Sequence, residues 1–366
     1  MNESERSDCE LVRQGWEQGS CLTKSKGKRV PACRATVRTT VRKTDGKSEL
    51  VERLITSIHL SRPENYLSIY QSGCNLSCRK CHSWHFTQTA DGTWYSPLGI
   101  LKECQEYEKQ VTLEEPREKA TAWHAHDSCA CCGYCVLAGK RSERCPGVLR
   151  PDQILLSPQG WGPARNIVAF TGGDLTCRPQ FYAQCAELIK AHTRLWILIE
   201  TNGYGLTPDN LRLLRSAGVD SFWLDIKAYD DEVHRWLTGG SNREILRLPE
   251  RMLDLGFVIE VLSLYIPRAV ETDQIEAIAH MLVRINPAIP FTILAFFPEY
   301  RMIGWRHPSA SEMVEAYRAA RNAGLTNVRL GNVGVVVEKE EDYELIRSEL
   351  HPTSQPTRDD PELLFD

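Results

Sequence analysis

Short runs of β-branched and aromatic residues alternate with amphipathic segments from about residue 160 to 335. These runs predict strands at Asn166–Phe170, Leu195–Glu200, Ser221–Asp225, Val258–Leu264, Phe291–Phe296 and Val328–Leu330. Between them, apolar residues recur at the three- and four-residue spacing of helices, and Gly218, Gly256 and Gly324 stand where helix C-caps are expected. Strict alternation of strand and helix predicts repeated βα units on a parallel sheet.

An earlier run, Tyr66–Tyr70, predicts the first strand of the same sheet. After it the rhythm breaks, because Pro, Gly, Cys and charged residues dominate up to the second strand, with one predicted helix near Pro97–Gln110. We therefore divide the chain into four parts. They are an N-terminal extension without an assignable fold (1–60), a core (61–84 and 160–337), an insertion (85–159) and an acidic C-terminal tail (338–366).

The composition is that of an ordinary globular protein, with 42% hydrophobic and 25% charged residues among 366. No apolar run approaches the ~20 residues that span a bilayer, and the polar N-terminus has no signal-peptide pattern, so a cytoplasmic protein without membrane contact is expected. A net charge of −4 does not favour nucleic acid. The basic stretch 23–53 is compatible with an acidic partner or with a solvated surface.

The chain has 14 cysteines, and a reducing compartment argues against a disulfide framework. Thiols in such a compartment are more often metal ligands or small buried apolar groups. Most of them fall into two short segments, which favours metal binding.

The first segment has the spacing C-x3-C-x2-C, formed by Cys74, Cys78 and Cys81 directly after the predicted first strand. Three thiolates so close together can hold three irons of a [4Fe–4S] cube and leave the fourth iron open, as a catalytic cluster requires. Zinc is the alternative, with His82 or His85 as the fourth ligand.

These cysteines, in this position, resemble the signature of the radical S-adenosylmethionine (SAM) superfamily. The chain is more specifically similar to pyruvate formate-lyase (glycyl-radical enzyme) activating enzymes and to the radical SAM protein of the AmmeMemoRadiSam system. The matching motifs are CHSW after the cysteines, TGGD at Thr171–Asp174, ETNGY at Glu200–Tyr204, WLDIKAYDDEVHRWLTGG at Trp223–Gly240, FFPEYRM at Phe296–Met302 and GNVG at Gly331–Gly334. The resemblance covers about Tyr66–Trp84 and Asn166–Val335.

The resemblance implies an α/β fold, namely a partial (β/α)6 TIM-like barrel of the radical SAM type with a Cys-rich insertion after the first strand. It also implies reductive cleavage of SAM at the cluster to a 5′-deoxyadenosyl radical that abstracts hydrogen from a substrate. Ferredoxin or flavodoxin is the expected type of electron donor. The implied cofactor-binding residues are Lys80, His82, Gly172, Gly173, Asp174, Glu200, Asn202, Asp225 and Lys227.

Three of these positions depart from the family pattern. Asp174 replaces the usual Glu, and Lys80 replaces an aromatic residue that packs near adenine, a role that His82 or Trp84 could take over. Glu200 replaces an Asp that, with Thr201 and Asp225, would hold a monovalent cation. A purely structural ion pair between Asp225 and Lys227 at a strand end is the alternative.

The second segment contains Cys129, Cys132 and Cys135 at C-x2-C-x2-C spacing, then Cys145 followed by Pro146. This pattern is similar to one half of a bacterial ferredoxin and predicts an auxiliary [4Fe–4S] cluster. A four-cysteine zinc site is the alternative, and Cys131 could replace a neighbouring ligand. Cys9, Cys21 and Cys33 are too far apart for a local metal site and stay unassigned; Cys185 is expected in the core, and Cys177 could line the active site.

The sequence therefore predicts a radical SAM enzyme acting on an unidentified small molecule, peptide or RNA. The alternative within the superfamily is an activating enzyme that installs a glycyl radical on a partner protein. A non-catalytic iron–sulfur or zinc module, which would need no SAM site, is the alternative from a different functional class. No catalytic residue beyond the cofactor ligands is identified.

Overall fold

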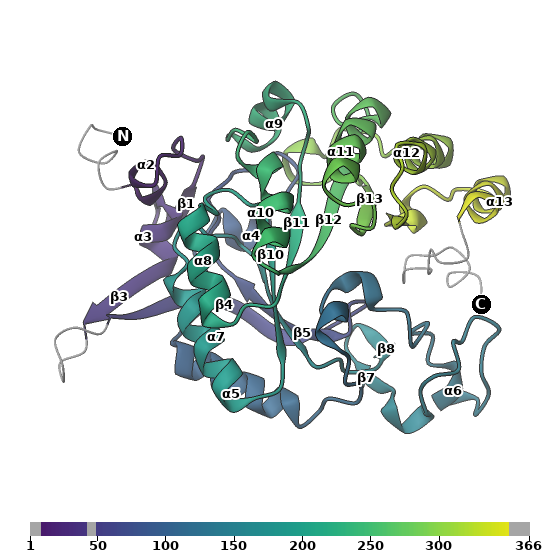
Figure 1. Ribbon diagram of the computed structural model, residues 1–366, viewed down its shortest axis with the longest axis horizontal. Helices are drawn as coiled ribbons and strands as arrows, with labels where there is room; N and C mark the ends of the chain where they lie inside the picture. The colour runs from purple at the N-terminus through teal and green to yellow at the C-terminus, as the bar shows by residue number, and fades with distance from the viewer. Residues whose placement is uncertain (1–8, 42–48, 351–366) are drawn as a thin grey trace.

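The computed structural model describes residues 9–41 and 49–350. Its centre is a ten-stranded sheet whose larger part is parallel (Figure 1). The parallel strands are β5 (Tyr66–Gln71), β9 (Ile167–Gly172), β10 (Trp196–Thr201), β11 (Ser221–Asp225), β12 (Val258–Tyr265), β13 (Phe291–Ala295) and β14 (Val328–Gly331), in this spatial order. The predicted α/β partial barrel is confirmed, and its seven parallel strands correspond to the seven strands predicted from the sequence, one more than a (β/α)6 barrel has.

Helices follow the strands and cover the convex side of the sheet. They are α7 (Gln180–His192), α8 (Pro208–Ala217), α9 (Asp231–Thr238), α10 (Leu248–Asp254), α11 (Thr272–Ile285), α12 (Ala310–Asn322) and α13 (Glu340–Glu349). Gly218, Gly256 and Gly324 adopt positive φ angles of 100°, 74° and 113° directly after α8, α10 and α12, as their positions in the sequence predict. Helix α9 was not predicted from the periodicity of the sequence. Its N-cap residue, Asp230, accepts hydrogen bonds from Glu232 N and Val233 N.

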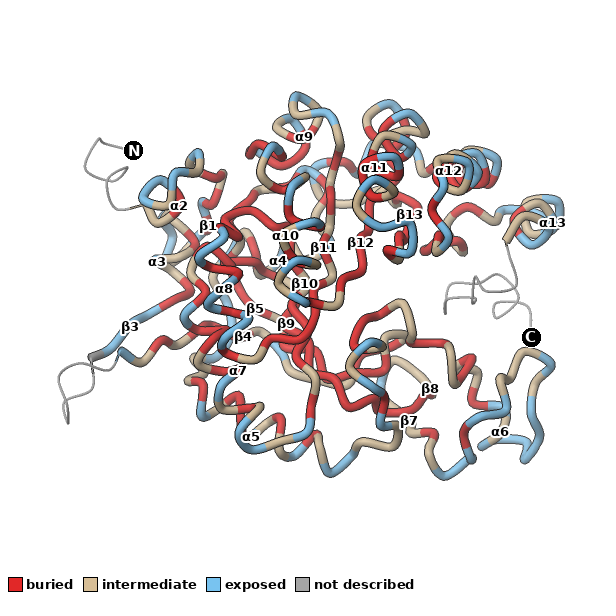
Figure 2. The backbone as a smooth tube through the Cα atoms, viewed as in Figure 1, coloured by how far each residue is buried: buried red, intermediate tan, exposed pale blue. Residues whose placement is uncertain are grey.

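Successive side chains of each strand point to opposite faces of the sheet, so the core has a convex and a concave part. On β9, Phe170 points outward and packs edge-on against Phe181 and Tyr182 of α7. Its neighbours Ile167 and Ala169 point to the concave face. Figure 2 shows that the parallel strands are buried along most of their length, whereas the helices expose one side.

The N-terminal residues extend this sheet. β4 (Glu49–Ser61) pairs antiparallel with β5, and both β3 (Val37–Val41) and β6 (Thr93–Tyr95) pair antiparallel with β4. A hairpin of β1 (Leu22–Ser25) and β2 (Lys28–Pro31) lies with the short helices α2 (Glu10–Arg13) and α3 (Ala32–Thr36) at the same end of the molecule (Figure 1). No fold was assigned to residues 1–60 from the sequence, and the structure places β3 and β4 of this part in the main sheet.

Between β5 and β9 the chain forms several short elements. They are α4 (Trp84–Thr87), β6, α5 (Pro97–Glu108), η1 (Arg117–Lys119), η2 (Ala122–His124), α6 (Tyr134–Leu137), η3 (Pro151–Gln153), β7 (Leu155–Ser157) and β8 (Gly160–Gly162). The helix predicted near Pro97–Gln110 is α5, which begins at the cap Ser96 and packs against α7. The remaining short elements are η4 (Ile245–Arg247), η5 (Tyr300–Met302) and η6 (Val333–Val335).

Residues 115–127, here called the floor segment, cover the concave face at the N-terminal ends of the strands. Ala120 and Ala122 pack with Tyr66 and other inward-facing residues of the sheet. Ser221 Oγ donates to Ala120 O at 2.5 Å, and Trp123 N donates to Glu260 Oε2 at 2.7 Å. The floor segment therefore covers the concave face at this end of the strands.

Candidate functional site

The loop after β5, here called the cluster loop (residues 72–83), carries Cys74, Cys78 and Cys81. Backbone hydrogen bonds tie it to the loop after β9 and to helix α9: Asn75 N donates to Asp174 O at 2.8 Å, and Arg79 N donates to Leu237 O at 2.7 Å. These segments follow the parallel strands β5, β9 and β11, and barrels of this type hold their active sites at the C-terminal ends of the strands.

The three thiols lie in a largely buried, mixed-charge environment. Burial raises the pKa of the Cys78 thiol to about 12, while the nearby Lys227 ammonium acts in the opposite direction. Burial also raises the pKa of Cys74, with Asp174 and Cys78 as its charged neighbours. Cys81 Sγ lies 3.5 Å from Thr87 Oγ1. The structure thus brings the predicted cluster residues together with Asp174 and Lys227.

Within residues 9–41 and 49–350, no three His, Cys, Asp or Glu side chains are arranged to hold a single metal ion. A four-iron cube makes a different demand, because each thiolate binds its own iron and the thiolates need not meet at one point. Three thiols on one loop, with a lysine beside two of them, fit such an anionic group.

Gly172 and Gly173 form a tight turn against the cluster loop. A Cβ on Gly173 would lie 2.2 Å from Gly73 O and 2.5 Å from Gln71 O. Gly172 has φ = 82°, which a residue with a side chain adopts only at a cost. The two glycines therefore allow backbone to approach backbone, in addition to the approach to a cofactor that the sequence suggested.

Asp174 braces this turn against the end of β10. Its Oδ2 accepts hydrogen bonds from Thr201 Oγ1 at 2.7 Å and from Asn202 N at 2.9 Å, and its Oδ1 accepts one from Thr176 N at 2.8 Å. Asn202 Nδ2 in turn donates to Asn75 Oδ1 at 2.9 Å and lies 3.6 Å from Cys74 Sγ. Asp174 and Asn202 thus connect three loops around Cys74.

Glu200 points to the concave face. Its Oε1 accepts a hydrogen bond from Tyr66 OH at 2.9 Å and its Oε2 one from Thr171 Oγ1 at 2.5 Å. Burial raises the pKa of Glu200 to about 8, although Thr171 and Tyr66 act in the opposite direction. Thr201 turns to the other side and bonds Asp174, and Asp225 pairs with Lys227, so the three residues expected around a monovalent cation have separate partners.

Asp225 and Lys227 form a half-buried ion pair at the end of β11. Asp225 Oδ1 and Trp223 Nε1 are buried and have no hydrogen-bond partner within the described part of the chain. Buried polar atoms are normally satisfied, so these two atoms are suited to a bound polar ligand. Lys227 lies near Cys78 and Cys81, which places this pair beside the cluster loop.

Lys80 and His82 bind the loop after β13 instead of standing free. Glu299 Oε2 lies 2.6 Å from Lys80 Nζ and 3.1 Å from His82 Nδ1. The Lys80 ammonium also lies 3.4 Å from the centre of the Phe297 ring. Trp84 stacks on Tyr300, with 5.1 Å between the ring centres. Glu299, Phe297 and Tyr300 were not selected from the sequence, although FFPEYRM contains all three.

The second cysteine group lies in the lobe around α6. Burial raises the pKa of Cys135, and the neighbouring Cys129, Cys145 and Cys132 thiols raise it further, so all four expected ligands are close together. The fifth, Cys131, has φ = 60° and accepts a hydrogen bond from Asn65 Nδ2 at 3.3 Å. Only Leu149 and Ile154 join Cys129 in the small buried core of this lobe.

The comparisons with known proteins agree with this arrangement. Residues 130–282 match the family model of the radical SAM superfamily. The chain contains a radical SAM domain. The match begins after the cluster loop, but β5, from which that loop emerges, pairs with β9 in the parallel sheet of the domain.

The radical SAM domain also has a curated relative. A protein of Methanocaldococcus jannaschii named "Putative glycyl-radical enzyme activating enzyme" is 26% identical over 157 residues, which are 42% of this chain and 58% of that protein. The matched region thus spans little more than half of the relative's length.

Two solved structures are similar at lower identity. A domain of a pyruvate-formate lyase-activating enzyme from Bacteroides vulgatus is 17% identical with a TM-score of 0.39, covering 45% of this chain and 98% of that one. SuiB from Streptococcus suis is 12% identical with a TM-score of 0.44, covering 73% and 50%. No helix in the described ranges has both the length and the apolar character needed to cross a membrane.

Proposed function

We propose that the radical SAM domain binds a [4Fe–4S] cluster through Cys74, Cys78 and Cys81 and cleaves SAM reductively. When bound, the cluster and SAM supply a one-electron cleavage that yields methionine and a 5′-deoxyadenosyl radical. The observation that carries the proposal is the meeting of the cluster loop with the TGGD turn, the end of β10 and the Asp225–Lys227 pair. A reduced ferredoxin- or flavodoxin-type protein is the proposed electron donor.

The chain's own residues would position SAM and exclude water. Asp174 and Asn202 hold the loops around Cys74, whereas Asp225 Oδ1 and Trp223 Nε1 remain available to polar groups of SAM or substrate. Lys80 and His82 contribute by fixing the loop after β13, and their bond to Glu299 favours this positioning role over a direct contact.

For Cys129, Cys132, Cys135 and Cys145 we propose an auxiliary [4Fe–4S] cluster, with a four-cysteine zinc site as the alternative. Their proximity and the small apolar core around them support a metal centre, since ligand binding can replace a missing core. Four available thiolates favour electron transfer or a structural role over direct substrate binding.

The substrate is proposed only as a class. The floor segment and the polar concave face support a small molecule or an extended segment of a peptide or RNA entering from the cluster side. A second candidate is an activating enzyme acting on a partner protein, which the name of the Methanocaldococcus jannaschii relative favours. Accumulation of a glycyl radical on such a partner, seen by electron paramagnetic resonance, would select the second candidate.

The test uses the anaerobically reconstituted full chain with SAM and dithionite, and 5′-deoxyadenosine is measured by liquid chromatography. We expect product from the wild type and none above background from Cys78→Ala. Cys185→Ala, at a buried helix position in α7, is the control and should retain both iron and activity. A wild-type protein with a full iron content but no 5′-deoxyadenosine would refute the proposal.

A further inference from the structure

Four cysteines that belong to neither group above come together in the fold. Three lie in the N-terminal residues and the fourth follows the TGGD turn; we call Cys9, Cys21, Cys33 and Cys177 the N-terminal cysteine group. Cys21 and Cys33 flank the β1–β2 hairpin, whose register pairs Leu22 with Pro31. Ala32 N donates to Cys21 O at 2.7 Å, so Cys21 and Cys33 are neighbours at the open end of the hairpin.

Cys9 and Cys177 reach the same place through α2. Cys9 is the N-cap residue of α2, and Gln14, which directly follows that helix, donates from Nε2 to Cys177 O at 3.0 Å. A Cβ on Gly205 would lie 2.4 Å from Cys177 Cβ and 2.8 Å from Leu11 Cδ2, so Leu11 and Cys177 pack on the same glycine. Helix α2 is thereby fixed against the segment that carries Cys177.

The thiols of the group affect one another electrostatically. Burial raises the pKa of Cys21 to about 11, and the Cys33 and Cys9 thiols raise it further. Burial raises the pKa of Cys177, and Cys33 is the next largest cause. Cys33 is thus the common neighbour of the other three, and Arg178 is the nearby cation that acts on it.

Buried polar atoms without a partner in the described residues lie near Cys177. Arg53 is only 1% exposed and donates from Nη2 to Ser72 O, but its Nε and Nη1 have no partner among the described residues. Its charge acts on Cys177. Thr176 Oγ1, next to Cys177, is also buried without a partner in the described part of the chain. A buried cation without a counter-charge is destabilising, so an anionic group beside Arg53 would remove a penalty.

We propose that Cys9, Cys21, Cys33 and Cys177 bind a further iron–sulfur cluster. An inorganic cluster held by thiolates is anionic and accepts hydrogen bonds at sulfur, which suits the free donors of Arg53 and Thr176. Asp174 is an electrostatic neighbour of both Cys74 and Cys177, so the new cluster lies behind the TGGD turn, close to the cluster loop.

Metal analysis of full-length variants tests the proposal independently of SAM cleavage. We expect the triple variant Cys9→Ala, Cys21→Ala, Cys33→Ala to contain about four irons fewer than the wild type, on the stoichiometry of a [4Fe–4S] cluster. The double variant Cys104→Ala, Cys185→Ala, which removes two fully buried thiols elsewhere in the core, should keep the wild-type iron content. Equal iron in the triple variant and the wild type, or a loss of zinc instead of iron, would overturn the proposal.

A second measurement needs no substitution. The anaerobic native protein is alkylated before and after chelation of iron, and each cysteine is quantified by mass spectrometry. The half-buried Cys9 and Cys33 should be protected before chelation and become reactive afterwards. Equal reactivity before and after, or a disulfide between any two of the four residues, would contradict cluster binding. Loss of SAM cleavage in a Cys78→Ala variant leaves this expected protection unchanged, so the two proposals can fail separately.

Discussion

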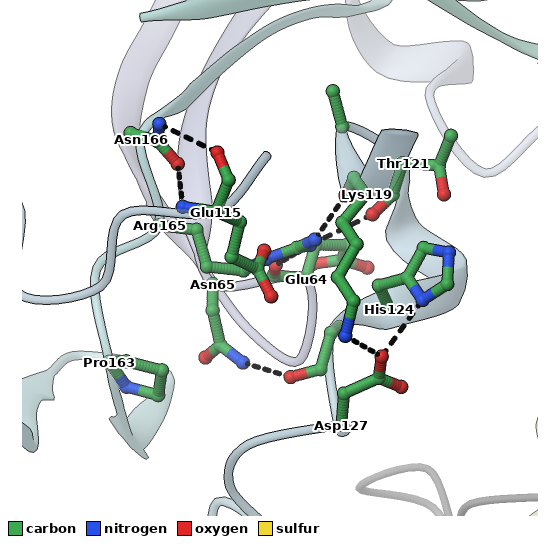
Figure 3. Close-up of polar contacts among 12 residues, drawn as sticks. Glu64, Asn65, Glu115, Lys119, Thr121, His124, Asp127, Pro163, Arg165 and Asn166 are labelled. Atoms are coloured by element: carbon green, nitrogen blue, oxygen red, sulfur yellow. Dashed lines mark hydrogen bonds and ion pairs between the residues drawn. The ribbon is translucent and has the colours of Figure 1, made fainter. Parts of the chain in front are cut away.

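Replacing Arg165 by methionine should release the floor segment from the sheet. Arg165 immediately precedes Asn166 and β9, and its side chain is fully buried (Figure 3). It forms an ion pair with Glu115 and donates to Thr121 O at 2.8 Å, Lys119 O at 2.6 Å and Glu64 O at 3.2 Å. One guanidinium therefore connects both ends of the 115–121 stretch to the base of the barrel.

The magnitude follows from what Arg165→Met leaves behind. The Glu115 side chain is 4% exposed and would lose its counter-charge, and breaking a buried pair in this way costs about 3–5 kcal/mol. Unfolding entropy is about 2.1 cal/mol/K per residue, or about 0.8 kcal/mol/K for a chain of this length. The melting temperature should therefore fall by about 4–6 °C.

The assay is thermal unfolding of the reconstituted protein, followed by circular dichroism. Arg150→Met is the matched control, because Arg150 pairs with Asp152 at the surface with side chains 70% and 69% exposed. It should change stability by less than about 0.5 kcal/mol. The double variant Arg165→Met, Glu115→Leu should regain part of the loss, since no charge is left buried. An Arg165→Met protein that melts like the Arg150→Met control would refute the assigned role.

Two further predictions concern the turn and the floor. Gly173→Ala would place a Cβ 2.2 Å from Gly73 O, so it should displace the TGGD turn and reduce 5′-deoxyadenosine formation by about 100-fold. Gly304→Ala, with no atom within 4 Å of the new Cβ, should retain wild-type rates. Burial lowers the pKa of His126 in the folded chain to about 4. As pH decreases from about 6.5 to 4, His126 therefore binds a proton in the unfolded chain before it does so in the folded chain, and the free energy of unfolding should fall over this range. His126→Phe should flatten that part of the stability profile in urea unfolding; an unchanged slope would contradict a buried neutral imidazole.

The sequence predicts the parallel strands well for a physical reason. Strands buried on both faces, such as Ile167–Gly172 and Trp196–Thr201, need continuous apolar runs, and such runs can be recognised directly in the amino-acid sequence. The caps at Gly218, Gly256 and Gly324 are equally local signals. By contrast, β4 has an irregular burial pattern and is half-exposed along much of its length, so no clear periodicity marks it.

The floor segment and the N-terminal cysteine group could not be predicted for a different reason. The floor segment has little regular structure, and its position depends on single long-range contacts such as Trp123 N to Glu260. Cys9, Cys21 and Cys33 are evenly spaced at twelve residues, and only the hairpin and α2 bring them to Cys177. Neither feature has a signature within a short window of sequence.

The geometry also accounts for the aspartate at position 174, where the family resemblance leads one to expect a glutamate. The Asp174 carboxylate accepts three hydrogen bonds from the protein, two of them from the end of β10. Those donors lie within reach of the shorter side chain, so Asp174 acts as a brace and its carboxylate is already occupied. On β11, Asp225 Oδ1 and Trp223 Nε1 are buried polar atoms that have no partner in the described residues, so they are left for a ligand. Recognition of SAM and substrate should therefore depend on β11 more than on the TGGD side chain.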